Sequence, residues 1–251
     1  MRNALFTDLA RIGGDDRPGV GLNDQGLPDI DWVEIPAGPF LYGEDQEKIE
    51  LDGFFISRYP ITHAQFQAFI DQGGYDQNQL WWQGLQHEPP EKAAWPFANR
   101  PRECVSWYDA TAFCRWLSVQ TGQIITLPTE QQWEKAARGE KGREYPWGDK
   151  YQSGYANCNE KRGKKGPFYL SQTSAVGIYP PGRSPYGIED MAGNVWEWTS
   201  SFYDADKDSY VFRGGAWSGN PDSLRASFRL RFLPDSRLSD FGFRVVCVPH
   251  R

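Results

Sequence analysis

Cysteine and histidine most often carry redox, nucleophilic or metal chemistry, and this sequence does not group them. None of its cysteines forms a CxxC pair, and its histidines lie far apart along the chain. Zinc sites and dithiol centres need closely spaced ligands, so we expect the cysteines to be small buried apolar side chains. The residues concerned are Cys104, Cys114, Cys158 and Cys247, with His63, His87 and His250.

Molecular recognition is the chemistry that the segment from Ser218 to Phe241 favours. Arginines recur through it as a regular frame, and the apolar residues between them follow neither the period of a strand nor that of a helix. Apolar residues without a burial period are poor core candidates and better surface candidates. Guanidinium groups form forked hydrogen bonds, so we expect the arginines to tie the segment to carbonyls and to carboxylates such as Asp235. The frame consists of Arg225, Arg229, Arg231, Pro234, Asp235 and Arg237.

The residues between the frame positions are typical of a binding surface, where a few large apolar anchors lie among small polar neighbours. The apolar candidates are Phe228, Leu230, Phe232, Leu233, Leu238 and Phe241. The polar candidates, which would supply adaptable hydrogen bonds, are Ser218, Asn220, Ser223, Ser236, Ser239 and Asp240. The alternative is that some of them pack inward, Phe228 and Phe241 above all, and that Trp217 belongs to the scaffold.

The composition favours a compact, loop-rich chain. Of 251 residues, 15% are aromatic, and 26 glycines and 18 prolines punctuate the sequence. The net charge of −6 argues against a nucleic-acid partner, and we interpret the basic run from Lys161 to Lys165 as a short solvated loop. No stretch approaches the roughly 20 apolar residues of a membrane span, and residues 1–30 lack the apolar centre of a signal peptide, so we expect a cytoplasmic protein.

The elements that would position these residues lie mainly in the first half of the chain. Residues 1–30 are predicted to be a flexible N-terminal lead, and 31–251 a single domain. Strand patterns run over 31–35 and 51–58, and capping boxes at Thr62, Ser106 and Thr129 each begin a helix. No helical pattern follows Gly139. The predicted fold class is therefore α+β, with few helices and much irregular loop and short β structure.

A series of short motifs follows one another along the chain. They are Trp32–Phe40, Val105–Ala110, Leu127–Glu134, Pro146–Asp149, Met191–Thr199, Arg213–Trp217 and Gly242–Arg244. Each motif alone is weak, but the ordered set resembles the formylglycine-generating enzyme (sulfatase-modifying factor) family from about residue 31 to the end. This resemblance implies the C-type-lectin-like fold of that family, in agreement with the α+β pattern.

The resemblance does not extend to the catalytic residues of the family. Its enzymes use a copper-binding cysteine pair upstream of a Pro-Asp, which corresponds here to Pro234 and Asp235. Counting back places the two cysteines at about Ala226 and Pro221, neither of which can bind copper. Iron-dependent sulfoxide synthesis, the other chemistry of this superfamily, needs a histidine cluster that the separated histidines do not provide. We therefore predict no catalysis and no redox cofactor.

An arginine frame around changeable positions also resembles the variable proteins of diversity-generating retroelements, whose variable region lies on this same fold. Adenine-directed mutagenesis of Asn codons in those systems cannot produce Lys, Glu, Gln, Met or Trp. None of these five occurs from Ser218 to Phe241. We therefore predict that 216–241 is a variable ligand-binding region.

The family resemblance further implies a bound structural calcium ion in the stretch 190–197. By that match Asp190 and Glu197 supply carboxylates, while Gly193 and Val195 supply main-chain oxygens. Calcium prefers hard oxygen ligands and tolerates carbonyls, so this loop suits it. The alternative is a Glu197 that is only salt-bridged. A second calcium site of the family would begin at Asn157, but we do not expect it because its acidic partner is missing from the following residues.

Together these observations predict a non-enzymatic protein that binds an unknown protein or other macromolecule through residues near 216–241. One alternative is an enzyme of the same family with altered chemistry, for instance a metal bound by Cys247 and a histidine. Another is a structural or regulatory domain of a signalling protein. The oligomeric state stays open.

Overall fold

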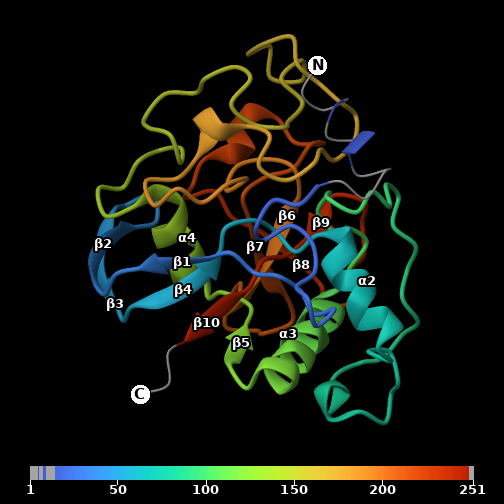
Figure 1. Cartoon of the computed structure of the whole chain (residues 1–251). Coiled ribbons are helices and arrows are strands. Elements are labelled where there is room, and N and C mark those ends of the chain that lie inside the picture. The colour runs from blue at the N-terminus through green and yellow to red at the C-terminus, as the bar shows by residue number, and fades with distance from the viewer. Residues whose placement is uncertain (1–4, 6–7, 10–14, 249–251) are drawn as a thin grey trace.

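The structure is a computed structural model that describes residues 5, 8–9 and 15–248. Its helices are α2 (His63–Asp71), α3 (Trp107–Thr121) and α4 (Glu130–Arg138), with short 3₁₀ helices η1 (Leu80–Trp82), η2 (Pro180–Gly182) and η3 (Pro221–Leu224). Its strands are β1 (Trp32–Ile35), β2 (Gly38–Tyr42), β3 (Glu47–Leu51), β4 (Phe54–Ser57), β5 (Ile124–Thr126), β6 (Trp196–Phe202), β7 (Tyr210–Arg213), β8 (Leu230–Phe232), β9 (Phe241–Gly242) and β10 (Val246–Val248). This arrangement confirms the predicted α+β class (Figure 1). None of the described helices is long and apolar enough to cross a membrane.

Each of these α-helices begins where the sequence predicts. Thr62, Ser106 and Thr129 are the N-caps, and each side chain accepts a hydrogen bond from the backbone three residues on. The side chain at that third position accepts in return from the N-cap amide, so both amide groups are satisfied. Helix α3 ends at Gly122, whose φ of 70° is left-handed and suits glycine.

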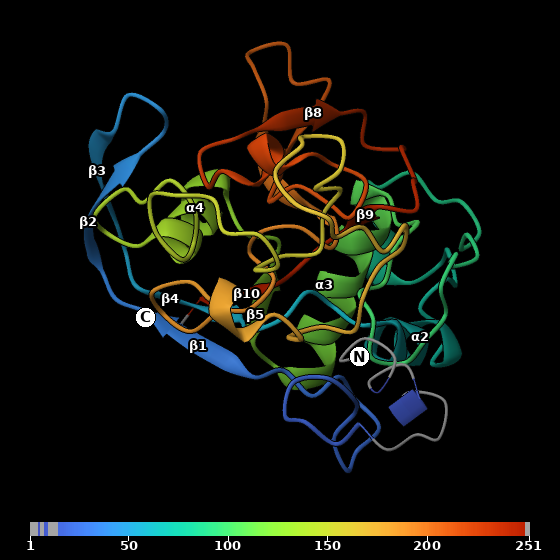
Figure 2. The same ribbon diagram turned by 90° about the horizontal axis from the view of Figure 1, so that it is seen from above.

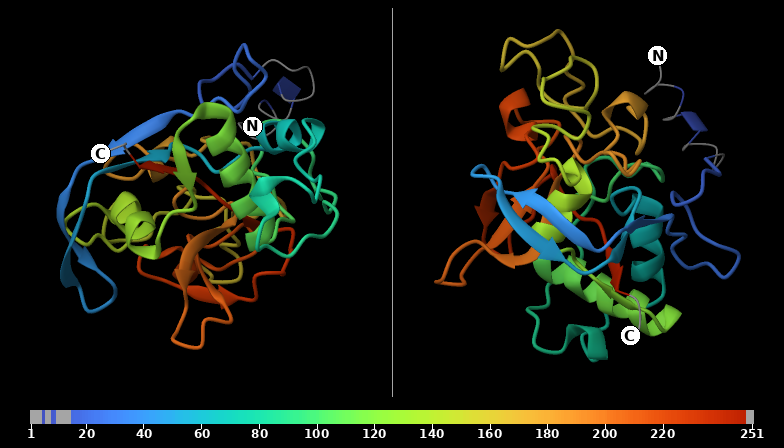
Figure 3. Two further views of the ribbon diagram at one scale, coloured as in Figure 1. Left: turned by 90° about the horizontal axis from the view of Figure 1, so that it is seen from below. Right: turned by 90° about the vertical axis from the view of Figure 1, so that its left-hand side faces the viewer.

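Strands from both ends of the sequence meet in one sheet. Its order is β1-β4-β10-β5, so the last strand lies between two strands of the first half (Figure 1). Cys247 of β10 pairs with Phe55 on one side and Ile125 on the other. A second sheet has the order β8-β7-β6-β9, with β8 at its edge. The β2–β3 hairpin stands apart from both sheets and contacts α4 (Figure 3).

Aromatic side chains fill the space between the helices and the sheets. Phe66 of α2 and Phe113 of α3 are fully buried, and their stacked rings lie 5.6 Å apart. Such ring pairs contribute about 1 kcal/mol beyond the burial of their area. From 139 to 195, where every residue is described, η2 is the one regular element. Irregular loops therefore make up this stretch, and several of their buried residues form a separate small cluster with Leu224.

The N-terminal segment is more closely packed than the sequence predicts. Val20 is buried, and its carbonyl accepts a hydrogen bond from Thr62 Oγ1 at 2.7 Å. Gln65 Nε2 donates to the carbonyls of Gly19 and Asp29. The polar, Gly-rich segment thus satisfies buried polar groups at the start of α2. Residues 15–30 belong to the folded domain, which corrects the predicted boundary at residue 31, and most of the remaining lead lies outside the described residues.

Candidate ligand-binding face

Arg213 of β7 forms the base of the candidate site. It is fully buried, and its guanidinium contacts the carboxylate of Glu134, which also accepts from Arg138 Nη1 at 2.7 Å. Arg213 Nη1 donates to the carbonyls of Ser227 at 2.8 Å and Phe228 at 3.1 Å. A buried guanidinium that is paired with buried carboxylates has a fixed position. Arg213 therefore holds the backbone at 227–228.

The frame arginines reach carboxylates outside their own segment, which confirms their predicted role of tying it down. Their partners come from the β2–β3 hairpin, α4, the loop after β6, and α3. Asp235, which we expected as a partner, is exposed. The pairs are Arg225–Glu44 at 3.1 Å, Arg229–Glu130 at 2.8 Å, Arg231–Asp204 at 2.8 Å and Arg237–Asp109 at 2.8 Å.

Backbone hydrogen bonds fix the chain between these arginines. The amide of Cys104 donates to the carbonyl of Leu238 at 3.1 Å, and the amide of Trp196 donates to that of Asp240 at 2.7 Å. Both donors belong to other parts of the fold. The irregular chain after β8 is thus held by the scaffold although it has no regular structure of its own.

Leucines are the most exposed of the predicted apolar anchors. Leu233 and Leu238 are 54% and 49% exposed. Phe228, Leu230 and Phe232 are half-buried, and each packs one side against the main core. Figure 2 shows β8 and the chain that follows it on the outer side of the molecule. These five apolar residues are therefore available, at least in part, to a partner.

Two of the predicted contact residues are buried, which corrects their assignment to the surface. Phe241 is 1% exposed because it lies in β9 against the rings of Trp198 and Phe212. Ser223 is buried in η3, where its amide donates to Asn220 Oδ1 at 3.2 Å. Phe241 therefore packs inward, as the alternative for this residue predicts.

The remaining polar candidates are half-exposed, and some already have partners. The Ser218 hydroxyl donates to the carboxylate of Asp240, and the Ser239 carbonyl accepts from Trp217 Nε1 at 3.3 Å. Ser236 is half-exposed as well. We call the accessible candidates the C-terminal face, which consists of Ser218, Asn220, Phe228, Leu230, Phe232, Leu233, Ser236, Leu238, Ser239 and Asp240.

The positions that correspond to the family's cysteine pair are apolar and buried. Ala226 packs in a cluster with Trp133 and Met191, and Pro221 begins η3. The four cysteines present elsewhere are buried and free, which confirms that prediction. Burial raises the pKa of Cys104 and of Cys158 to about 11, so both thiols stay protonated at neutral pH.

No group of three or more His, Cys, Asp and Glu side chains that could hold a metal occurs within the described residues. Cys247, the metal ligand of the alternative enzyme hypothesis, lies in the middle of a sheet, and burial raises the pKa of its thiol. His250 lies outside the described residues.

Glu197, one of the predicted calcium ligands, is held by an arginine. Arg244 donates to both of its carboxylate oxygens, at 2.6 and 2.8 Å, and Trp133 Nε1 donates at 2.6 Å. All three side chains are fully buried. Glu197 is therefore salt-bridged in this structure, as in the alternative, and its role as a calcium ligand stays a prediction.

Asp190 is the second predicted carboxylate of the calcium site. It is buried, and its Oδ2 accepts from the amide of Gly177 at 2.7 Å. Burial, together with the nearby carboxylate of Glu189, raises its pKa to about 7. The carbonyl of Gly193 already accepts from the amide of Val195 at 3.0 Å. Calcium at 190–197 stays a prediction.

Buried oxygens without partners occur nearby, where we expected no ion. Asn157 Oδ1, Thr173 Oγ1 and Ser174 Oγ are buried and accept or donate no hydrogen bond among the described residues. Asn157 and Ser174 both contact the side chain of Asn194. Such groups in a native fold call for a water or an ion. Asn157 is the residue at which the family's second calcium site would begin, but sequence reasoning missed Thr173 and Ser174 because they come from a separate loop.

An aromatic group beside the C-terminal face was also not predicted. The rings of Trp95 and Trp217 lie 5.2 Å apart at nearly right angles, and Tyr169 lies 6.4 Å from Trp217. All three are half-exposed. They come from distant loops with no shared period, so no local pattern reveals them.

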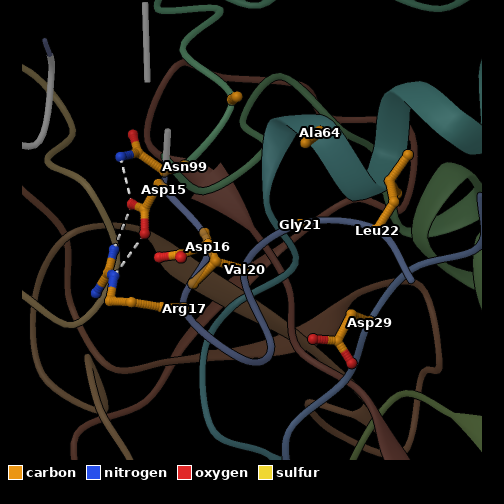
Figure 4. Close-up of a pocket in the computed structure, with 10 residues that line it drawn as sticks. Asp15, Asp16, Arg17, Val20, Gly21, Leu22, Asp29, Ala64 and Asn99 are labelled. Atoms are coloured by element: carbon orange, nitrogen blue, oxygen red, sulfur yellow. Dashed lines mark hydrogen bonds and ion pairs between the residues drawn. The ribbon is translucent and has the colours of Figure 1, made fainter. Parts of the chain in front are cut away.

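A separate cavity of about 380 Å³ lies between the N-terminal segment and α2 (Figure 4). Asp15, Asp16 and Asp29 line it, and the Asp15 carboxylate is bonded to Arg17 and Asn99. None of the predicted contact residues belongs to its lining. It is therefore distinct from the C-terminal face.

Comparison with known proteins decides the family. The profile of the sulfatase-modifying factor enzyme 1-like domain matches residues 23–248. The chain belongs to this family. The family and the fold that the sequence predicts are therefore both confirmed.

Its relatives in sequence include proteins with different names. An inactive C-alpha-formylglycine-generating enzyme 2 from Bos taurus is 31% identical, over 86% of this chain and 87% of that protein. A hercynine oxygenase from Mycolicibacterium smegmatis is 31% identical, over 85% of this chain and 60% of that protein. Membership of the family therefore does not decide whether this chain is an enzyme.

Treponema denticola variable protein 1 has the same fold. Its structure superposes with a TM-score of 0.64 over 87% of this chain and 95% of that chain, at 22% sequence identity. At this identity the likeness concerns the fold alone.

Proposed function

We propose that this member of the family is a non-catalytic protein that binds a macromolecule through the C-terminal face. The observation that carries the proposal is a separation of roles within 216–241. Paired arginines fix the backbone, while Leu233, between Arg231 and Arg237, and Leu238, just after Arg237, stay about half exposed. Covering apolar surface contributes about 25 cal/mol per Å², so a partner that covers these side chains gains affinity.

The same separation supports a surface that tolerates sequence change. Each frame arginine is anchored on a residue outside the segment, so the positions between the arginines can change without loss of the anchors. The fold likeness to a protein named as variable is consistent with such a surface. We propose that the face is diversified, as the composition of 218–241 suggests.

The residues at the cysteine positions support a role without catalysis. Ala226 is fully buried and Pro221 is buried, so neither position presents a reactive group. A relative with 31% identity is itself named inactive. These observations concern the copper chemistry of the family.

The DNA beside the coding sequence tests the diversification. We expect an adjacent reverse transcriptase gene and a near-copy of the 3′ coding region that differs at adenine positions within codons 216–241. Substitutions spread evenly between frame and face codons, or the absence of such a copy, would contradict diversification but would leave binding open.

Binding itself is tested with a double variant. Leu233→Ser with Leu238→Ser removes the exposed anchors, and Leu80→Ser with Val119→Ser removes two exposed apolar side chains of η1 and α3 as a control. On an array of immobilised cell-surface proteins, wild type and the control variant should bind the same proteins. The Leu233→Ser/Leu238→Ser variant should not bind them. Equal binding by all three would refute the face, and no binding by wild type would favour a purely structural domain.

An enzyme with altered chemistry is the second candidate, favoured by the 31% identity to a hercynine oxygenase. Oxygen consumption tests it, with iron(II) or copper(I) and a thiol substrate supplied. We expect no consumption above that of the metal and thiol without protein. Turnover that is lost in a Cys247→Ala variant would replace the binding proposal with the enzyme reading.

A further inference from the structure

The loop from Lys161 to Lys165 is rich in positive charge. Lys161, Arg162, Lys164 and Lys165 are all exposed, and none of them forms an ion pair with another described residue. The whole chain has a net charge of −6. The loop is therefore a positively charged patch on a protein whose net charge is negative.

A buried carboxylate gives this loop a defined shape. Glu160 is fully buried and accepts hydrogen bonds from the Tyr151 hydroxyl at 2.6 Å, the Ser153 hydroxyl at 2.8 Å and the Gly154 amide at 2.7 Å. Its backbone amide donates to the carbonyl of Phe168 at 3.1 Å. These bonds close the loop at its base, so the backbone that carries the cations is fixed to the fold at that point.

The loop forms an edge of the C-terminal face. The amide of Asn159 donates to the carbonyl of Gly219 at 2.8 Å. A Cβ atom on Gly163 would lie 2.8 Å from Pro221 Cδ, so the two backbones are in close contact there. Tyr169, just after the loop, lies against Trp217. The unpaired cations therefore stand beside the residues that we propose as the binding surface.

Other positive groups of the face do not compete with the loop for an acidic partner. The frame arginines already pair with carboxylates of the scaffold, for example Arg229 with Glu130 and Arg237 with Asp109. Lysines without counter-charge attract opposite charge over about one Debye length, roughly 10 Å at moderate salt. The loop is thus the source of positive potential next to the face.

We propose that the basic loop selects a protein partner with an acidic patch next to an apolar contact. This inference rests on the proposed binding function and names the chemistry of the ligand. Apolar contacts with a charged rim are the usual anatomy of protein interfaces, and here Phe168, three residues after the last lysine of the loop, is 56% exposed. Four charges on a molecule of net charge −6 are too few for nucleic acid. The loop then acts on the rate of association and on the choice of partner.

The test uses a fluorescent oligoglutamate peptide as the probe. The loop variant K161Q/K164Q/K165Q is compared with K48Q/K141Q/K150Q, which removes the same charge from three exposed lysines of other loops and strands. We expect the affinity of the loop variant for oligoglutamate to fall about tenfold and that of the control to stay near wild type. Wild-type affinity should also fall as NaCl rises. Equal loss in both variants would overturn the proposal.

Two comparisons separate this inference from the alternatives. Heparin and duplex DNA are measured in the same way, and binding to either that is tighter than to oligoglutamate overturns the choice of an acidic protein. The Leu233→Ser/Leu238→Ser variant should keep its affinity for oligoglutamate, because the loop is intact. If the face variant binds the array like wild type while the loop variant loses oligoglutamate binding, the proposed C-terminal face is refuted and the basic-loop proposal is not. If the face variant loses array binding while the loop variant binds oligoglutamate like wild type, the basic-loop proposal alone is refuted.

Discussion

At the scale of single residues, we expect the carboxylate of Glu197 to contribute to the stability of the fold. It accepts from Arg244 and Trp133 in a fully buried setting. Glu197→Gln leaves the guanidinium of Arg244 without its counter-charge, so the free energy of unfolding should fall by about 3–5 kcal/mol. Urea unfolding with EDTA or with calcium measures it, and the exposed Glu50→Gln serves as control. We expect the same loss in both media. A calcium-induced gain in wild type that disappears in Glu197→Gln would instead make Glu197 a calcium ligand.

Asp190, also at the residue scale, predicts a dependence of stability on pH. Burial raises its pKa from 3.8 to about 7 in the folded protein. Between these values the folded state binds more protons than the unfolded state, so this group makes the free energy of unfolding fall as pH rises. The slope from one group is at most about 1.4 kcal/mol per pH unit. Asp190→Asn should reduce this slope. Glu189, whose pKa is also raised, still contributes to the dependence of stability on pH.

Urea unfolding at a series of pH values in EDTA measures this slope. The variant gains stability relative to wild type as pH rises from 4 to 7, and the gain levels off above that range. Asp24→Asn, at an exposed position, is the control. A parallel shift of both curves at every pH would show that the carboxyl of Asp190 does not titrate in this window.

At the scale of elements, the segment after β8 should separate into positions that hold it and positions that it displays. Arg237 makes two hydrogen bonds to Asp109, the buried residue that completes the capping box of α3. Arg237→Ala should cost about 3 kcal/mol, because it leaves that carboxylate without its cation. The neighbouring Leu238→Ser should change the free energy of unfolding by less than about 0.5 kcal/mol. Thermal unfolding compares the two, and equal losses would refute the separation.

Local signals in the sequence predict the elements better than they predict the face. The capping boxes at Thr62, Ser106 and Thr129 need only a few neighbouring residues, so they are found correctly. The burial of Phe241 depends on pairing with β6, and the hold on Glu197 depends on Arg244 from a distant part of the chain. Such contacts across the chain leave no period in the sequence. The aromatic group around Trp217 was missed for the same reason.

At the scale of the whole molecule, the sheet that joins both ends of the chain predicts how the protein responds to truncation. Strand β10 pairs with β4 and β5 at once, so the first half cannot complete this sheet without the last residues. A chain that ends at Gly242 loses β10 together with Arg244, and Glu197 is then buried without its cation. We expect this chain to lose its cooperative unfolding transition, because a central strand and a buried ion pair are removed together. Circular dichroism during urea titration measures the transition, and Val248→Thr, at a partly exposed position of β10, should keep it. A cooperative transition in the truncated chain at the wild-type midpoint would mean that the two halves fold without the strand that joins them.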